Sequence, residues 1–142
     1  MESKLNPYLG FKDNAREAME FYKTIFGGKL EFHTFKEWEA SKDPNEDDKI
    51  MHSMLEADNG ITFMASDTPN NMGYKMGTNI SMSLSGSNEA ELRNYFNKLS
   101  EGGAVAMPLD KSAWGDAFGM VIDKFGIQWM VNISMKKMDD EW

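Results

Sequence analysis

Apolar side chains recur with helical spacing in two parts of the chain, "NAREAMEFYKTIFGG" from Asn14 and "NEAELRNYFNKLSEGG" from Asn88. In both parts the apolar positions follow i, i+3, i+4, i+7, which places them on one face of an α-helix. These positions are Ala18, Phe21, Tyr22 and Ile25 in the first part and Leu92, Tyr95, Phe96 and Leu99 in the second. Because Asn is a favoured N-cap and Gly a favoured helix end, the pattern predicts two amphipathic helices of about three to four turns.

The two helical parts belong to an internal repeat. At an offset of 74 residues, Phe21 matches Tyr95. A later pair, "NGITFMAS" from Asn59 and "FGIQWMVN" from Phe125, matches at an offset of 66, and both segments read as strands entered through a turn that contains Gly. The strands before them, "IMHSMLEA" and "FGMVID", align as well. Each copy is therefore predicted to be a strand, a helix and three further strands.

The repeat predicts an α+β fold in one domain, residues 1–142, with two βαβββ units whose curved antiparallel or mixed sheets surround a cavity. The first unit covers about residues 4–67 and the second about residues 78–134. The shorter second offset places extra residues of the first copy in "FKEWEASKDPNEDDK", which reads as an extended loop or hairpin. The stretch "SDTPNNMGYKMG" reads as the linker, and residues 135–142 read as a frayed tail.

Alternation along the predicted strands separates two faces of each sheet. The face expected to pack on the helix carries Leu9, Phe11, Leu55, Ile61, Phe63, Ala65, Ile80, Met82, Leu84, Val121, Ile127, Trp129 and Val131. The opposite face is polar and rich in Met, and it carries Asn6, Tyr8, His52, Met54, Met64, Asn79, Phe118, Met120, Met130 and Asn132. An antiparallel sheet can expose such a face to water, but the repeat favours two curved sheets that close a concave cavity.

Composition narrows the classes of function. The net charge is −8 and the chain has no Cys, which excludes disulfide and thiolate chemistry and fits a cytoplasmic protein. No apolar run reaches the roughly 18 residues of a membrane span, and the N-terminus does not read as a signal peptide. No basic patch suggests nucleic-acid binding, so the acidic balance favours neutral or cationic small molecules as partners.

Four segments resemble the PhnB-like branch of the vicinal oxygen chelate superfamily, which includes glyoxalases, bleomycin-resistance proteins and extradiol dioxygenases. They are "PYLGFKDNAREAMEFYKTIFGG", "DKIMHSMLEADNGITFMASD", "SLSGSNEAELRNYFNKLSEGG" and "MPLDKSAWGDAFGMVIDKFGIQWMVNI". The resemblance covers about residues 4–134 and implies the duplicated βαβββ fold. Members of this branch often carry a name that relates them to a demethylubiquinone methyltransferase. This sequence has no G-x-G-x-x-G and no parallel βαβ pattern, so an S-adenosylmethionine site is not expected.

Catalytic members of the superfamily hold a divalent metal with His, Glu or Gln on the first and last strands of the two units. The resemblance places these positions at Asn6, Met64, Asn79 and Met130. A thioether is a poor ligand for hard or borderline divalent ions, and a neutral amide is a weak one. We therefore expect no metal at the position usual for the superfamily, and no cofactor.

His52 is the candidate catalytic residue, because an imidazole on the open face suits proton transfer or ligand hydrogen bonding near neutral pH. The alternative is a His whose hydrogen bonds are satisfied by a neighbouring side chain. His33 lies on a strand that is expected to be partly exposed, and it is a weaker candidate. Glu56 is expected to be solvated, and Asp116 is expected to hydrogen-bond its own turn rather than a ligand cation.

Trp114 precedes Gly115 at a bend, where an indole would cap the cavity, stack on a planar ligand, or serve as a core or dimer-interface residue. The candidate ligand-binding residues share the open face or its rim, and they are Asn6, Tyr8, Met54, Met64, Asn79, Trp114, Phe118, Met120 and Met130.

Four functions remain open. The favoured one is metal-independent binding of a small molecule by a homodimer. The alternatives are a metal-independent lyase, isomerase or transferase that uses His52, and a structural or regulatory domain without a ligand. A metal-dependent enzyme of the glyoxalase or dioxygenase type is disfavoured by the donor residues described above.

Overall fold

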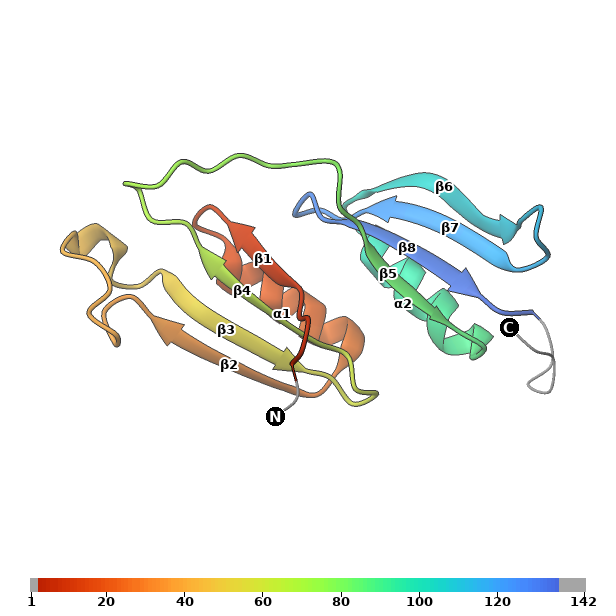
Figure 1. Cartoon of the computed structure of the whole chain (residues 1–142), viewed down its shortest axis with the longest axis horizontal. Coiled ribbons are helices and arrows are strands. Elements are labelled where there is room, and N and C mark those ends of the chain that lie inside the picture. The colour runs from red at the N-terminus through yellow and green to blue at the C-terminus, as the bar shows by residue number, and fades with distance from the viewer. Residues whose placement is uncertain (1–2, 136–142) are drawn as a thin grey trace. The chain divides into compact units, whose positions relative to one another are not determined.

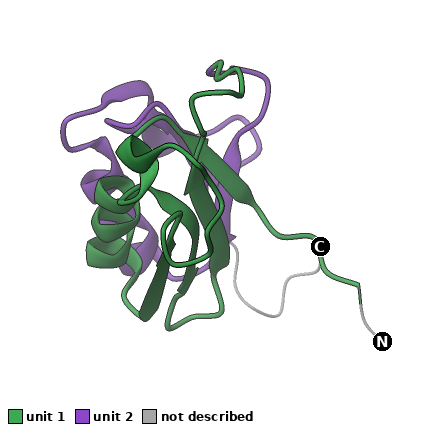
Figure 2. Cartoon of the chain, turned by 90° about the vertical axis from the view of Figure 1, so that its left-hand side faces the viewer, with its two compact units in different colours: residues 1–75 green, residues 76–142 purple. Residues whose placement is uncertain are grey.

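The computed structural model describes residues 3–135, which includes only the first residue of the expected tail. The chain divides into two compact units, residues 1–75 and 76–142, which Figure 2 shows in green and purple. No helix in the described part of the chain is long and apolar enough to cross a membrane.

The first unit is a four-stranded sheet with one helix (Figure 1). Its elements are β1 (Tyr8–Phe11), α1 (Ala15–Phe26), β2 (Lys29–Thr34), β3 (Ile50–Glu56) and β4 (Thr62–Asp67). The sheet order is β1-β4-β3-β2, with β1 parallel to β4 and the other two pairs antiparallel.

The second unit repeats this arrangement with β5 (Met82–Gly86), α2 (Glu89–Ser100), β6 (Ala104–Lys111), β7 (Ala117–Ile122) and β8 (Gln128–Ile133). Its order is β5-β8-β7-β6, again with a parallel first pair and two antiparallel pairs. The predicted duplicated βαβββ architecture is confirmed.

Each helix covers one face of its own sheet, and the buried residues lie between the two. The alternation predicted from the sequence is confirmed along most strands, where the buried set includes Leu9, Phe11, Leu55, Phe63, Ala65, Leu84, Val121, Trp129 and Val131. Both helices bury apolar stripes that contact three or four strands of their own sheet. In α1, Met19 and Phe26 are buried whereas the predicted Phe21 is only half-buried, because the buried stripe is shifted slightly around the helix.

The alternation fails before β5. Ile80 was expected to pack on the helix, but it is 80% exposed. The strand begins only at Met82, where pairing with Trp129 of β8 starts, so the residues before it have no ladder to assign them to a face. Asn79 lies in the same segment, and Asn6 likewise precedes β1, so neither is a strand residue as the sequence pattern suggested.

The two helices begin with different caps. Asn88 caps α2 as predicted, since its side chain accepts a hydrogen bond from Glu91 N at 3.1 Å. Asn14 precedes α1 but makes no side-chain capping bond. Instead, Asp67 at the end of β4 accepts hydrogen bonds from Ala15 N and from Ile50 N, both at 2.9 Å. One buried carboxylate therefore ties together the start of α1, the start of β3 and the end of β4.

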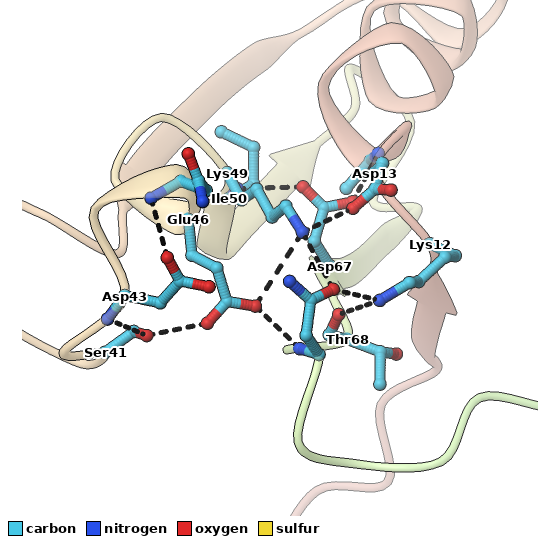
Figure 3. Close-up of polar contacts among 12 residues, drawn as sticks. Lys12, Asp13, Ser41, Asp43, Glu46, Lys49, Ile50, Asp67 and Thr68 are labelled. Carbon is cyan, nitrogen blue, oxygen red and sulfur yellow. Dashed lines mark hydrogen bonds and ion pairs between the residues drawn. The ribbon is translucent and has the colours of Figure 1, made fainter.

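The charged insertion of the first unit, residues 35–49, is neither an extended loop nor a hairpin. It consists of turns and a short 3-10 helix, η1 (Pro44–Glu46). Glu46 is 3% exposed, and its carboxylate accepts hydrogen bonds from Ser41 Oγ and from Asn70 N, each at 2.6 Å (Figure 3). Lys49 Nζ lies 2.7 Å from Asp13 and 3.7 Å from Glu46. This network fastens the insertion to residues 68–70, directly after β4.

The network should make stability depend on pH at both extremes. The hydrogen bond from Lys49 lowers the pKa of Asp13, and the bonds from Ser41 and Asn70 lower the pKa of Glu46. Both carboxylates therefore stabilise the fold above their ordinary pKa values of 3.8 and 4.5, and this contribution is lost as pH falls through the lower folded values. The hydrogen bond to Asp13 raises the pKa of Lys49 from 10.5, so its contribution disappears only when pH rises above that value.

We expect the urea midpoint of unfolding to fall as pH drops below the ordinary carboxyl value of 4.5 and again as pH rises above 10.5. The variant Glu46→Gln should flatten the acid decline, whereas Glu101→Gln, at an exposed position in the second unit, should leave it unchanged. Equal acid declines in the wild type and Glu46→Gln would show that the network does not contribute.

Candidate functional site

The open face of the first sheet, on the side away from α1, brings together several of the predicted site residues. Tyr8 is paired with Met64 in the parallel ladder, and Met64 is paired with Met54 across β3 and β4. His52 lies two residues before Met54 on β3 and is half-buried, whereas its neighbours Ser53 and Leu55 are fully buried. Alternation thus places these four side chains on one face, as the sequence predicted.

Tyr8 and His52 form the polar centre of this face. The hydroxyl Oη of Tyr8 lies 3.2 Å from Nδ1 of His52, and the ring centroids are 5.8 Å apart. When the hydroxyl donates to an unprotonated Nδ1, the imidazole proton is on Nε2, which can then donate to a ligand. The sequence left open whether His52 is satisfied by a neighbour, and the structure provides that neighbour while keeping the second ring nitrogen for other contacts.

Two further aromatic side chains adjoin His52. His33 on β2 is the cross-strand partner of His52, and its Nδ1 contacts the carboxylate of Glu37. The indole of Trp38, in the turn after β2, stacks on His33 with a centroid distance of 4.9 Å. From the sequence, His33 was only a weak candidate and Trp38 was not predicted to be a site residue. The signal that the sequence lacked was the register of β2 against β3, which includes a bulge between His33 and Thr34.

A cavity of about 750 Å³ lies next to this cluster within the first unit. Tyr8, Met51 and Ser66 contribute to its wall from the sheet, and Phe35, Glu46 and Met72 are among the residues that line it from the insertion and from the segment after β4. His52 and Trp38 do not line it, so Tyr8 joins the cavity to the aromatic cluster. A volume of this size lies within the usual range of small-molecule pockets, roughly 300–1,000 Å³.

The open face of the second sheet has a different chemistry. Met120 is paired with Met130, and Phe118 is paired with Asn132, so Phe118 takes the position of His52, while Ser83, paired with Met130, takes that of Tyr8. Phe118 and Met120 are half-buried while Ala117, Gly119 and Val121 are buried, which confirms the predicted alternation within this unit.

Trp114 lies over this second face. Its Nε1 donates to Asn132 Oδ1 at 3.2 Å, and its ring lies 5.3 Å from that of Phe118. A smaller cavity of about 340 Å³ is lined by Trp114, Phe118 and Met107. Asp116 is 4% exposed, and its carboxylate accepts hydrogen bonds from Asn132 Nδ2 at 3.0 Å and Met135 N at 3.3 Å. Asp116 does hydrogen-bond its own turn, as expected, but through its backbone oxygen, which accepts from Ser112 N and from Ser112 Oγ, each at 2.7 Å. Its carboxylate instead fixes the end of β8.

The donor set does not fit the divalent metal of the superfamily. Within residues 3–135, no group of three or more His, Asp or Glu side chains is placed to hold an ion. The strand positions where the superfamily has its ligands carry the thioethers of Met64 and Met130, while Asn6 and Asn79 are exposed and precede their strands. Soft neutral sulfur and weak amide oxygen are poor ligands for such ions.

Two βαβββ units, each with one helix-covered sheet face and one open face, define the class of glyoxalase-like folds. The family model for 3-demethylubiquinone-9 3-methyltransferase matches residues 3–132, and the chain belongs to this family of PhnB-like proteins. The described sheets each contain a single parallel strand pair, so they lack the doubly wound parallel sheet typical of a dinucleotide-type site.

Solved structures agree with this assignment. Protein PA1353 from Pseudomonas aeruginosa is 39% identical, covers 94% of this chain and 98% of its own, and superposes with a TM-score of 0.81. A Bacillus cereus PhnB protein, described as a putative 3-demethylubiquinone-9 3-methyltransferase, is 26% identical over 93% of this chain and 100% of its own, with a TM-score of 0.73. A glyoxalase-related enzyme from Fulvimarina pelagi shares the fold, with 17% identity over 94% and 89% of the two chains and a TM-score of 0.59.

Proposed function

We propose that this protein binds a small molecule on the open face of the first sheet without a metal ion. The observation that carries the proposal is the Tyr8–His52 pair, a hydrogen-bonding centre on a half-exposed face beside a cavity of about 750 Å³. Small-molecule sites combine an apolar lining with a few placed polar groups. Met54 and Met64 supply an adaptable apolar surface next to that pair.

The second unit supports the assignment of the site to the first. It has Phe118 where the first unit has His52, and its cavity is about 340 Å³. The net charge of −8 favours neutral or cationic ligands over anionic ones.

Native mass spectrometry of protein purified without added ligand should show a bound adduct that survives treatment with a chelator. The variant His52→Phe keeps a ring but loses the hydrogen bond with Tyr8 and the polar contact of the imidazole with the ligand. Such a polar contact contributes on the order of 1.5 kcal/mol. We therefore expect the amount of bound adduct to be lower by a factor of about ten or more. The matched control Phe118→Leu alters the equivalent position of the second unit and should retain the adduct. Loss of the adduct with the chelator, or equal retention by His52→Phe, would contradict the proposal.

The second candidate is a metal-independent lyase, isomerase or transferase, and the same hydrogen bond favours it. Tyr8 orients His52 through Nδ1, as a general acid or base is oriented by a second residue. Incubation of the protein with the ligand recovered from the adduct separates the two functions. Conversion by the wild type and not by His52→Phe would establish catalysis, whereas recovery of unchanged ligand would leave binding as the function.

We also propose that the protein is a homodimer. The sheet edges are formed by β1 and β2 in the first unit and by β5 and β6 in the second, and large apolar side chains such as Leu5 and Ile80 are 99% and 80% exposed. Pairing of edges and covering of exposed apolar residues are common reasons for self-association. Light scattering at micromolar concentration should give twice the chain mass of 16.1 kDa. A monomer at that concentration would contradict this proposal.

A further inference from the structure

Trp38 lies over a pair of imidazoles on the open face of the first sheet. Its ring plane is within 20° of that of His33 and within 14° of that of His52, with centroid distances of 4.9 and 5.9 Å. The two imidazoles are 6.4 Å apart and also inclined by only 20°. His33 and His52 are cross-strand neighbours, and the three rings therefore lie nearly parallel, with the indole stacked against both imidazoles.

The turn that carries Trp38 is exposed but stands on a fixed base. Phe35 is 2% exposed and its N donates to Lys49 O at 3.0 Å, while Ala40 N donates to Phe35 O at 2.9 Å. Between these anchors, Trp38 remains 48% exposed, and Glu39 has a φ of 50°, which residues other than Gly rarely adopt. Trp38 N donates to Thr34 O at 3.3 Å, so the backbone of the turn is hydrogen-bonded, while the indole itself is about half exposed.

The cover belongs to the first unit. The insertion of residues 35–49 has no counterpart in the second unit, where β6 and β7 are joined by the short turn of residues 112–116. The position of His52 is taken there by Phe118. The network of Glu46 and Lys49 fixes the base of the insertion, which carries the indole that stacks on two imidazoles, whereas Trp114 of the second unit contacts Phe118 and Asn132.

We propose, on the basis of the small-molecule binding proposed above, that Trp38 occupies in the free protein the place of a planar aromatic group of the ligand, which displaces it. The imidazole faces on which the indole stacks can accept a planar ring of the ligand in its place, and Tyr8 Oη and His52 offer polar contacts at its edge. Trp38 thus lowers the affinity of the free protein for the ligand, because its contacts with the two imidazoles must be broken first.

Titration with 2-naphthol and its saturated analogue decahydro-2-naphthol tests this inference. Both probes are neutral alcohols of the same skeleton, but only 2-naphthol is planar. We expect 2-naphthol to shift the imidazole signals of His33 and His52 in NMR spectra of the wild type, and the saturated analogue to bind at least about tenfold more weakly. Trp38→Ala should bind 2-naphthol on the order of tenfold more tightly than the wild type, since two ring contacts no longer compete.

Tyr74→Ala serves as the matched control, because it removes an exposed aromatic ring that neither lines the cavity nor was a candidate for ligand binding, and it should leave the affinity unchanged. If Trp38→Ala does not fold, Trp38→Leu removes the planar ring while keeping apolar bulk. Weaker or unchanged binding by the Trp38 variant overturns the inference, since Trp38 would then contact the ligand or take no part. Equal binding of the two probes, or no binding of either, also overturns it. None of these results contradicts small-molecule binding itself, which native mass spectrometry tests separately.

Discussion

Replacement of Gly28 by Ala should lower the free energy of unfolding by roughly 4 kcal/mol, the sum of a left-handed backbone penalty and a steric clash with the backbone at the end of β3. Gly28 follows α1 with a φ of 89°, and a Cβ at this position would lie 2.1 Å from the backbone oxygen of Glu56 and 2.6 Å from Ala57 Cα. These atoms cannot move away cheaply, because Glu56 is paired with Lys29 in the ladder of β2 and β3. Urea unfolding monitored by circular dichroism measures the change.

Gly60 provides the matched control for this prediction. It has a φ of 87°, but no heavy atom lies within 4 Å of a Cβ at its position. Gly60→Ala should therefore show only the backbone penalty, about 1–2 kcal/mol. If Gly28→Ala costs no more than Gly60→Ala, the close approach to the carbonyl of Glu56 is not what requires glycine at position 28.

This pair of glycines illustrates what local patterns predict and what they omit. The sequence identified both Gly pairs as helix ends. The structure adds that Gly28 and its repeat counterpart Gly103 lie against strand carbonyls, since a Cβ at Gly103 would be 2.3 Å from Ile122 O. The helices and strands were predictable because their periodicity is local. The close approach depends on the path of another strand, which no local pattern describes.

In the candidate site, too, the sequence predicted some residues and missed others. Alternation placed Tyr8 and His52 on one face, and the structure brings them within 3.2 Å. Alternation could not identify His33 or Trp38 as neighbours of His52. Their proximity to His52 depends on the β2–β3 register and on the course of a charged insertion. Alternation also predicted that Asn79 belongs to a strand, although it lies before Met82, where the pairing of β5 with β8 begins. Residues within regular ladders were thus predictable, and residues contributed by irregular segments were not.

The two units also meet the same structural requirements with different side chains. In the second unit, the turn between β7 and β8 is organised by Asp123, which is 3% exposed. Its Oδ1 accepts hydrogen bonds from Phe125 N at 2.8 Å and Ile127 N at 3.1 Å, and its Oδ2 accepts from Trp129 Nε1 at 2.8 Å. The equivalent residue of the first unit, at an offset of 66, is Ala57, so this carboxylate has no counterpart there.

Asp123→Ala should lower the free energy of unfolding by about 3–4 kcal/mol, because it leaves buried N–H donors, including that of the largest fully buried side chain, Trp129, without their acceptor. Asp123→Asn retains one oxygen for the turn but presents an amide nitrogen toward Trp129 Nε1, so it should recover roughly half of the loss.

In the Asp123→Ala background, Trp129→Phe should cost less than it does in the wild type, since its hydrogen bond is already gone. Urea unfolding of the four variants measures this coupling. Additive effects of the two substitutions would contradict the role assigned to the Asp123–Trp129 hydrogen bond.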